Sequence, residues 1–577
     1  MFGAILRRGF FICAFYYQAI PRLQDLLSDL LKQHNDATNN GDFDKLDEIL
    51  YQYNDLCNQF YMEPTILFSI GTIFLQKQWH GLAINLLTHV LNSSPDTQHL
   101  PQIWNNLGTA YKGEHIDDKA RECWEKALSL VDEDEDTVLA AEYHSNLATL
   151  HINTGDPRDG YEHIVRSCEL MPDNKKSWWN RALLELELGD YENGFRNYEH
   201  GRLTGDRYDR WGKYYTPYYN GEDLTGKSII VYGEQGIGDE IMFVSALQDL
   251  IDTGAKVHYE CHDRLTSLMK RTFPDITVTG TRKEKEEDTE IDIDQFDYRM
   301  GVGSLFRWFG VKKRPPYLKP SPELLDHYKI KLQVLGKRLK VGIGYEAGHK
   351  KTHGHVRSFK LALLEPILDM NGCEFVSLQY TEGATAKFSN HFMQTGVKVH
   401  HWPDTLYRTS DIGFNMDHTV ALIAALDVCV LPNTTAVHIC GAVGTTCYTL
   451  TPVSCAWRYL NGGDHMVGTS SVYGPSRVVM ERDFSRFGVE STFVDTSDLE
   501  AVKAAIRPNT RLVFVETPAN PTIVLSNLGA IADIAHDNGA LVLVDNTFAT
   551  PILQRPIEHG VDIVMHSMTT FINGHTD

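Results

Sequence analysis

The sequence predicts a multidomain protein in which an α-helical solenoid precedes α/β structure that occupies the rest of the chain. At 577 residues, the chain is long enough for about three or four domains. Small residues recur at Gly71, Gly108, Ala148 and Ala182, at intervals of 37, 40 and 34 residues, which is typical of stacked helical repeats. From Lys227 onward, apolar runs of strand length replace the helical period, which indicates α/β units.

The composition is that of a globular protein and excludes several classes of function. Hydrophobic residues make up 42% of the chain and charged residues 23%, which is ordinary for a folded domain. The 54 Lys and Arg residues face 76 Asp and Glu residues, and the net charge of -22 argues against general nucleic-acid binding. The ten cysteines form no CxxC pair and no Cys/His run with zinc-ligand spacing, so we expect no metal site.

Residues 1–19 form an N-terminal extension whose character the sequence leaves open. Arg7 and Arg8 precede an apolar run, and no acidic residue comes before Asp25, as in some targeting peptides. The alternative is a helical start to the next domain. The apolar run, residues 9–20, is too short to span a bilayer, so we expect no transmembrane segment and a cytoplasmic protein.

Residues 20–203 are predicted to stack as antiparallel helix pairs, because small residues in phase let two helices approach closely. The second unit has large and small residues in the order Trp104, Leu107, Gly108, Tyr111, Ala120, Trp124 and Ala127. This pattern resembles the tetratricopeptide repeat. The resemblance implies a concave surface for a protein partner, and a rigid spacer remains an equal alternative.

Residues 204–335 contain the first α/β unit. The stretch KSIIVYGEQGIGDEIMF predicts a buried strand, a glycine turn and an amphipathic helix. Gly236 and Gly238 permit a tight turn and the close approach of a ligand, and Asp239 falls in the first turn of the helix. A turn of this kind is more often structural than catalytic when nothing else supports it.

Residues 336–459 contain a second α/β series, which starts at Leu339 and ends in HTVALIAALDVCVLPNTTAVHICGAVGTTCYTLTP. Together with YYTPYYNGEDLTGKSIIVYGEQGIGDEIMF, this stretch resembles tetratricopeptide proteins that continue into a heptosyltransferase-like glycosyltransferase of family 9. The resemblance implies a GT-B architecture, in which two Rossmann-like halves face each other across a cleft.

The glycosyltransferase resemblance implies a nucleotide-sugar donor, no metal, and Asp239 as the base that takes the acceptor's proton. Helix N-termini and a basic residue would receive the diphosphate. Asn433 stands where the family has an acidic residue, and His438 is either a ligand or a packing residue. The residues expected to contact substrate are Gly236, Gly238, Lys350, Arg357, Asn433, Thr434, Thr435 and His438.

Residues 460–577 follow Trp457-Arg458-Tyr459 with no linker rich in Gly, Pro or Ser. Five blocks follow in family order: LNGGDHMV, RFGVESTFVD, IRPNTRLVFVETPANPT, AHDNGALVLVDNTFATPILQRP and GVDIVMHSMTTFINGH. They resemble the large domain of the Cys/Met-metabolism family of pyridoxal-phosphate enzymes, which includes cystathionine gamma-synthase and methionine gamma-lyase. The resemblance implies part of a fold type I α/β domain.

Five residues match cofactor contacts of that family. The resemblance implies that Tyr473 stacks on the pyridine ring, Asn520 contacts the ring hydroxyl and Asp545 pairs with the ring nitrogen. Ser567 and Thr569 would donate to the phosphate. Without the resemblance, each of these polar residues would be assigned to packing at a loop or strand end.

The family's lysine position holds Thr570, and no lysine follows Lys503. A threonine hydroxyl neither forms the covalent link to the cofactor nor moves the substrate's α proton near neutral pH. We therefore expect weak or absent binding of pyridoxal phosphate and an inactive region.

Three hypotheses for the function follow from the sequence. The first is a glycosyltransferase on a tetratricopeptide scaffold. The second is a pyridoxal-phosphate-dependent transsulfuration enzyme, which Thr570 opposes. The third is a non-catalytic repeat adaptor or a fused gene whose parts do not cooperate, which the abrupt junction near Tyr459 favours.

Overall fold

The computed structural model describes residues 64–567 and a few isolated positions before them. The gaps in this range are residues 96, 98, 155–156, 208–214, 281–290, 348–356, 381–382, 403–415, 452–463, 488 and 520–521. The N-terminal extension lies outside the described residues. The chain divides into two compact units, residues 1–150 and residues 151–577.

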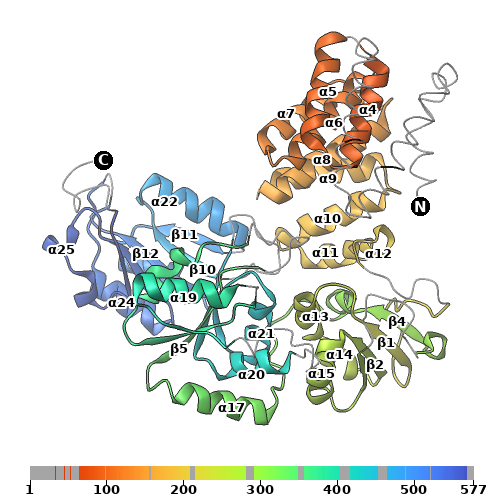
Figure 1. Cartoon of the computed structure of the whole chain (residues 1–577). Coiled ribbons are helices and arrows are strands. Elements are labelled where there is room, and N and C mark those ends of the chain that lie inside the picture. Colours follow the sequence, from red (N-terminus) through yellow and green to blue (C-terminus); the bar gives the residue numbers. More distant parts are fainter. Residues whose placement is uncertain are drawn as a thin grey trace. The chain divides into compact units, whose positions relative to one another are not determined.

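Paired helices form the described part of the first unit (Figure 1). They are α4 (Pro64–Gln76), α5 (His80–Ser93), α6 (Leu100–Gly113), α7 (Asp117–Leu128) and α8 (Thr137–Thr154), the last of which crosses the division between the units. The recurring small residues lie where helices meet. A Cβ atom on Gly108 would fall 2.5 Å from Nε1 of Trp124, and Ala120 is fully buried. This packing explains the repeat in physical terms, and its assignment to the tetratricopeptide family stays a prediction.

The second unit begins with four further helices: α9 (Pro157–Leu170), α10 (Lys175–Glu187), α11 (Tyr191–Tyr198) and α12 (Gly201–Thr204). The side chain of Asn174 accepts a hydrogen bond from the backbone amide of Lys176 and thereby caps α10. The ring of Phe195 lies 5.4 Å from the ring of Phe306 and 6.3 Å from that of Phe243. These helices therefore share a core with the first sheet, although the sequence predicts a boundary between residues 203 and 204.

The first sheet has four parallel strands in the order β3-β2-β1-β4. Its strands are β1 (Ser228–Tyr232), β2 (Lys256–Cys261), β3 (Thr277–Gly280) and β4 (Tyr298–Gly301). Its helices are α13 (Ile237–Val244), α14 (Leu247–Ile251), α15 (Thr266–Thr272) and α16 (Leu305–Phe309). Because β1 is buried on both faces, its sequence is a continuous apolar run and not an alternating one.

The second sheet has five parallel strands in the order β7-β6-β5-β8-β9. Its strands are β5 (Leu339–Ile343), β6 (Cys373–Ser377), β7 (Val399–His400), β8 (Val428–Pro432) and β9 (Thr446–Leu450). Its helices are α17 (Pro322–Gln333), α18 (Glu365–Leu368), α19 (Ala384–Thr395), α20 (Asp417–Ala425) and α21 (Thr435–Val443). Helix α21 packs on α13, and one buried cluster joins the first two sheets.

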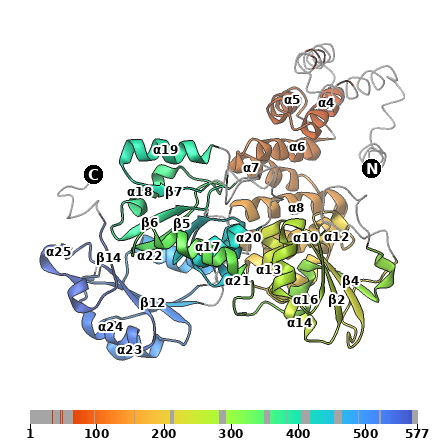
Figure 2. The same cartoon turned by 60° about the horizontal axis from the view of Figure 1, so that its bottom comes forward.

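The third sheet also has five parallel strands, in the order β11-β10-β12-β13-β14. They are β10 (His465–Thr469), β11 (Glu490–Val494), β12 (Thr510–Glu516), β13 (Leu541–Asp545) and β14 (Ile563–Met565). The helices are α22 (Gly474–Val478), α23 (Leu499–Ala505), α24 (Leu528–Asp537) and α25 (Thr550–Leu553). Helices α23 and α24 lie on one side of this sheet (Figure 2).

Short helical turns complete the described elements. Turns of the 3-10 type occur at Asp263–Leu265, Ile293–Gln295, Val302–Ser304, Leu361–Leu364, Phe484–Phe487 and Pro556–His559, and a π-helical turn at Val479–Asp483. The structure is thus a mixed helical and parallel α/β protein, as the sequence predicts. Among the described residues, none of the helices has the length and apolar character needed to cross a bilayer.

Candidate functional sites

The first candidate site lies where α13 of the first sheet meets α21 of the second. Gly236 is the N-terminal cap of α13, and Asp239 stands in the first turn of that helix, half-buried. A Cβ atom on Gly238 would fall 3.0 Å from Cδ2 of His438 and 3.3 Å from Oγ1 of Thr435. The absence of a side chain at Gly238 therefore lets the two helices approach. Of the predicted residues, the structure brings Gly238, Thr435 and His438 into direct proximity.

The loop between β8 and α21 forms the other wall of this site. Asn433 is 1% exposed, and its Oδ1 atom has no hydrogen-bond partner among the described residues. Its backbone carbonyl accepts a hydrogen bond from Nη1 of Arg357 at 2.6 Å. Thr434 caps α21 in an extended conformation, without a bond from its side chain to the helix. The amide groups at the start of α21 and the guanidinium of Arg357 together suit an anion. Lys350 lies outside the described residues.

A buried ion-pair cluster, formed by Arg207, Glu234, Glu199 and Ser304, holds the glycine turn that leads to α13. Glu234 accepts hydrogen bonds from Nε and Nη2 of Arg207 at 2.9 Å and 2.7 Å, and Nη2 also donates to Ser304. The backbone amide of Gly303 donates to the same carboxylate at 2.7 Å. Burial alone would lower the pKa of Arg207, but the charges of Glu234 and Glu199 outweigh it and raise that pKa.

Sequence reasoning missed this cluster. Arg207 follows the helical repeats, and Glu234 stands in the glycine turn, so neither belongs to a recognisable motif with the other. The one available signal was that both are charged residues beside apolar segments, which is too common to identify a pair.

The second candidate site lies at the carboxyl edge of the third sheet, where parallel strands end side by side. Asp545 ends β13 and is 8% exposed, and its Oδ1 atom accepts hydrogen bonds from the amide and the hydroxyl of Thr547 at 3.0 Å and 2.5 Å. Thr547 in turn accepts a bond from the backbone amide of Ser567 at 2.8 Å. Hydrogen bonds thus link the predicted residues Asp545 and Ser567 through Thr547.

The neighbouring strand ends complete this edge. Glu516 ends β12 and is 3% exposed, and its Oε2 atom accepts a hydrogen bond from the backbone amide of Tyr473 at 2.7 Å. The backbone amide of Glu516 donates to the hydroxyl of Thr469, at the end of β10, at 3.1 Å. The phenol ring of Tyr473 is 50% exposed at the start of α22. Glu516 was not among the predicted residues. Its hydrogen bond to the backbone amide of Tyr473 fixes the position of the backbone that carries the tyrosine ring.

The residues at this edge fit pyridoxal phosphate in part. The buried carboxylate of Asp545 suits a protonated ring nitrogen, and the bonds it makes to Thr547 use only Oδ1. Tyr473 offers an exposed aromatic ring, and Ser567 offers a hydroxyl after β14. Asn520, Thr569 and Thr570 lie outside the described residues, so the structure gives no geometry for them.

Comparison with known proteins gives matches for the part of the chain that contains the third sheet. Residues 435–577 match the family described as Cys/Met metabolism PLP-dependent enzyme. L-Methionine gamma-lyase of Fusobacterium nucleatum is 53% identical over 125 residues, which cover 22% of this chain and 32% of that protein. Cystathionine beta-lyase MetC of Bacillus subtilis is 46% identical over 125 residues, with the same two shares.

Two further similarities each cover about a fifth of this chain. Cystathionine gamma-synthase of Mycobacterium tuberculosis is 48% identical over 124 residues, covering 21% of this chain and 32% of that protein. The crystal structure of metB from Corynebacterium glutamicum is 44% identical over 21% of this chain and 31% of that chain, with a TM-score of 0.20. The chain spans about a third of the length of the curated relatives it matches.

The C-terminal region is therefore similar in sequence to pyridoxal-phosphate-dependent transsulfuration enzymes, as predicted. The family match begins at Thr435, whereas the sequence prediction starts the region at Leu460. The tetratricopeptide and glycosyltransferase assignments remain predictions.

Proposed function

We propose that the C-terminal region binds pyridoxal phosphate and a sulfur-containing amino acid, in the manner of a transsulfuration enzyme. The observation that carries this proposal is that Tyr473, Asp545 and Ser567 gather at one sheet edge inside the segment that matches the family. The substrate class follows from the relatives, whose names refer to methionine and cystathionine.

Each residue has a defined task in this proposal. The cofactor, when bound, supplies a protonated ring that withdraws electrons from the α carbon of an amino acid. Asp545 keeps the ring nitrogen protonated, because a buried carboxylate favours the positive charge beside it. Tyr473 covers one face of the ring, and the hydroxyl of Ser567 donates to the phosphate.

Thr570 sets the limit of this function. Because a hydroxyl replaces the family's amine, the chain holds the cofactor without a covalent link and lacks the group that moves the α proton. The proposal is therefore binding with little or no turnover. Replacing Thr570 with lysine returns the amine to the site.

The test uses the full chain titrated with pyridoxal phosphate and followed by cofactor absorbance, then by borohydride reduction and peptide mass analysis. We expect reversible binding that dialysis removes, and, when borohydride is added after dialysis, no stoichiometric adduct on any one lysine of the unmodified chain. Thr570→Lys should form a stoichiometric adduct at residue 570. A stoichiometric adduct on a single lysine of the unmodified chain would contradict the role given to Thr570, and absence of binding in both forms would contradict the proposal.

A matched pair of variants tests the assignment of Asp545. Asp545→Asn should weaken cofactor binding about tenfold, because the amide no longer favours a protonated ring. Asp562 provides the control, since it bonds to His536 and to the amide of Val542 and is not part of the candidate site. Asp562→Asn should leave the affinity unchanged. Equal losses in the two variants would show that the effect is not local to the strand end.

A second candidate function is sugar transfer from a nucleotide donor by the first two sheets. The observation that favours it is the buried Oδ1 atom of Asn433, which has no hydrogen-bond partner among the described residues and lies just before α21, the helix whose Thr435 and His438 meet Gly238. In this function Asp239 takes the acceptor's proton, and α21 with Arg357 receives the diphosphate.

The second candidate is tested by turnover of a panel of nucleotide sugars. Asp239→Asn should lower turnover about a hundredfold and leave nucleotide affinity nearly unchanged. Asp252→Asn, which changes a carboxylate bonded to Gln248, serves as the control. Undiminished turnover in Asp239→Asn would remove Asp239 from the role of base, and absence of turnover and nucleotide binding in the native chain would remove this candidate.

A further inference from the structure

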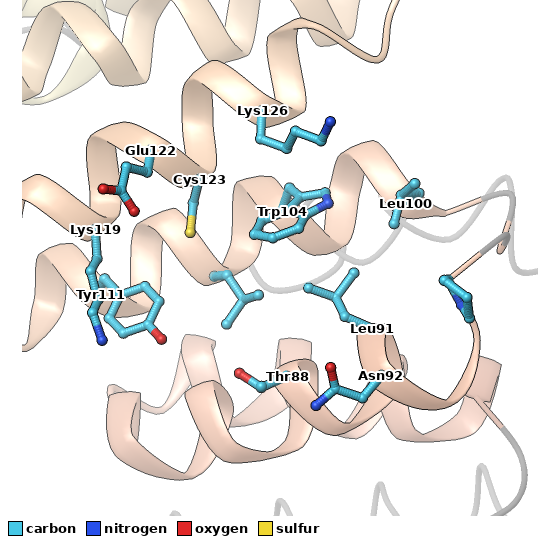
Figure 3. Close-up of a pocket in the computed structure, with 12 residues that line it drawn as sticks. Thr88, Leu91, Asn92, Leu100, Trp104, Tyr111, Lys119, Glu122, Cys123 and Lys126 are labelled. Carbon is cyan, nitrogen blue, oxygen red and sulfur yellow. The ribbon is translucent and has the colours of Figure 1, made fainter.

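A groove of about 490 Å³ lies between α5, α6 and α7 of the first unit (Figure 3). Pockets of this volume are large enough for several side chains of a ligand. The lining residues are Thr88, Leu91, Asn92, Pro95, Leu100, Trp104, Leu107, Tyr111, Lys119, Glu122, Cys123 and Lys126.

Each of the three helices turns one face toward this groove. The residues from α6 are Leu100, Trp104, Leu107 and Tyr111, whose spacing places them in one stripe along the helix. Asn105 and Asn106 of the same helix are already occupied, because they bond to Glu142 of α8 and to Thr72 of α4. The apolar stripe of α6 is therefore the one that faces the open groove.

The rim on α7 carries three charges in alternating order. Lys119, Glu122 and Lys126 stand three and four residues apart on the exposed side of this helix, so they line one edge of the groove. Two helical turns separate the lysines, which corresponds to about 10 Å along the axis. None of the three forms an ion pair within the part of the chain that the structure describes, whereas nearby Lys112 and Asp117 bind each other at 2.7 Å.

We propose that this groove binds an amphipathic helix of a partner protein. The apolar side chains of the partner helix lie on Trp104 and the residues next to it, in the arrangement by which helices dock in apolar grooves. The partner helix carries acidic, basic and acidic residues at positions i, i+4 and i+7, because this order is complementary to Lys119, Glu122 and Lys126. The site goes beyond the functions proposed above and depends on neither of them.

The test compares two fluorescent, end-capped helical peptides of about 18 residues, titrated against the full chain and followed by anisotropy. Both carry leucines on one face, and they differ in their three flanking charges. One has glutamate, lysine and glutamate at i, i+4 and i+7, and the other has lysine, glutamate and lysine. The first should bind about tenfold tighter, and added salt should narrow the difference. Equal affinities, or no binding of either peptide, would overturn the proposal.

A charge-swap variant makes the test specific to this edge. The triple change Lys119→Glu, Glu122→Lys and Lys126→Glu should reverse the preference between the two peptides. The triple change lowers the net charge by two units. Arg166→Glu lowers it by the same amount at an exposed side chain of α9 that does not line the groove, so it should preserve the preference. If Arg166→Glu reverses the preference as strongly as the triple change, net charge and not the groove governs binding, and the proposal fails.

Leu91→Asp tests the apolar wall, because it places a carboxylate among the side chains that the peptide would cover. Both peptides should lose binding about tenfold or more, while circular dichroism and thermal unfolding report whether the helices remain folded. Unchanged affinity in a folded Leu91→Asp protein would also overturn the proposal.

Discussion

The first two sheets differ from the third in how completely their apolar residues are covered. A single buried cluster within residues 179–442 joins the first two sheets and the helices before them. In the third sheet, Leu541 and Ile563 are 49% and 44% exposed on the face opposite α24, and Ile552 and Leu553 of α25 are 87% and 81% exposed. Parallel sheets are ordinarily covered on both faces. Among the described residues, the region with the recognised relatives thus leaves more of its apolar side chains exposed than the first two sheets do.

The largest expected effect is at the buried ion-pair cluster of the covered region. Arg207→Met removes a fully buried cation and leaves the carboxylates of Glu234 and Glu199 without their principal partner. We expect a loss of about 3–5 kcal/mol in the free energy of unfolding, measured by urea denaturation. The control is Arg196→Met, because Arg196 and its partner Glu192 are both exposed, and it should cost less than about 1 kcal/mol. Similar losses in both variants would mean that the covered region does not depend on this cluster.

The pH dependence of the stability loss in Arg207→Met tests whether the charges of the buried cluster stabilise the fold. Burial would raise the pKa of Glu199, but the charges of Arg207 and Arg202 outweigh it and hold this pKa below its ordinary value. A lowered pKa stabilises the fold above the unfolded value of about 4.3, and the contribution is lost as the pH falls through the folded value. The stability difference between the native chain and Arg207→Met should therefore be widest near neutral pH and narrow under acid. A difference that stays constant into acid would argue that the charges contribute nothing.

A smaller effect is expected in the first unit, which also has a covered core. Ala120 is fully buried beside Trp124 and Leu147, so Ala120→Trp should overpack this contact and cost about 1–3 kcal/mol. Glu125→Trp places the same side chain on the exposed side of α7 and should change stability by less than about 0.5 kcal/mol. Thermal unfolding of the two variants measures the difference, and equal midpoints would contradict close packing at Ala120.

The smallest effect on stability is expected at helix α25, whose leucine is exposed. Leu553→Ser should change the free energy of unfolding by less than about 0.5 kcal/mol, since the leucine side chain is mostly in water already. Val544→Ala, on the covered face of the third sheet, should cost about 2 kcal/mol. Sedimentation velocity should show less self-association for Leu553→Ser, because exposed apolar patches promote contact between copies. A large loss of stability in Leu553→Ser would mean that this surface is covered in solution.

The strands were the most predictable part of the fold. The apolar runs after Lys227 and from Leu339 have strand length and end at glycines, and the structure begins β1 at Ser228 and β5 at Leu339. What covers each element was not predictable, because a hydrophobic period identifies an apolar face and not its partner. The sequence therefore grouped Phe195 with the repeats, whereas its ring packs on Phe243 and Phe306.

The candidate sites were likewise predictable residue by residue, but not in how their residues come together. Gly238 and His438 were assigned to one site through resemblance, and their proximity depends on the packing of α13 against α21, which no local pattern encodes. The bond from Ser567 through Thr547 to Asp545 likewise depends on the order of the strands. Thr570, in contrast, is informative without any structure, because its meaning lies in the chemistry of the side chain.

The core that α10 and α11 share with the first sheet decides where the chain can be divided for expression in parts. A fragment that starts at residue 204 would leave Phe243 and Phe306 facing water and would deprive Arg207 of Glu199. Such a fragment should aggregate or be degraded. A division after Thr154 keeps α8 whole and keeps these contacts intact, and it lies close to the separation between the two compact units. Limited proteolysis should accordingly release the helices α9 to α12 together with the sheets and not with the helices before them.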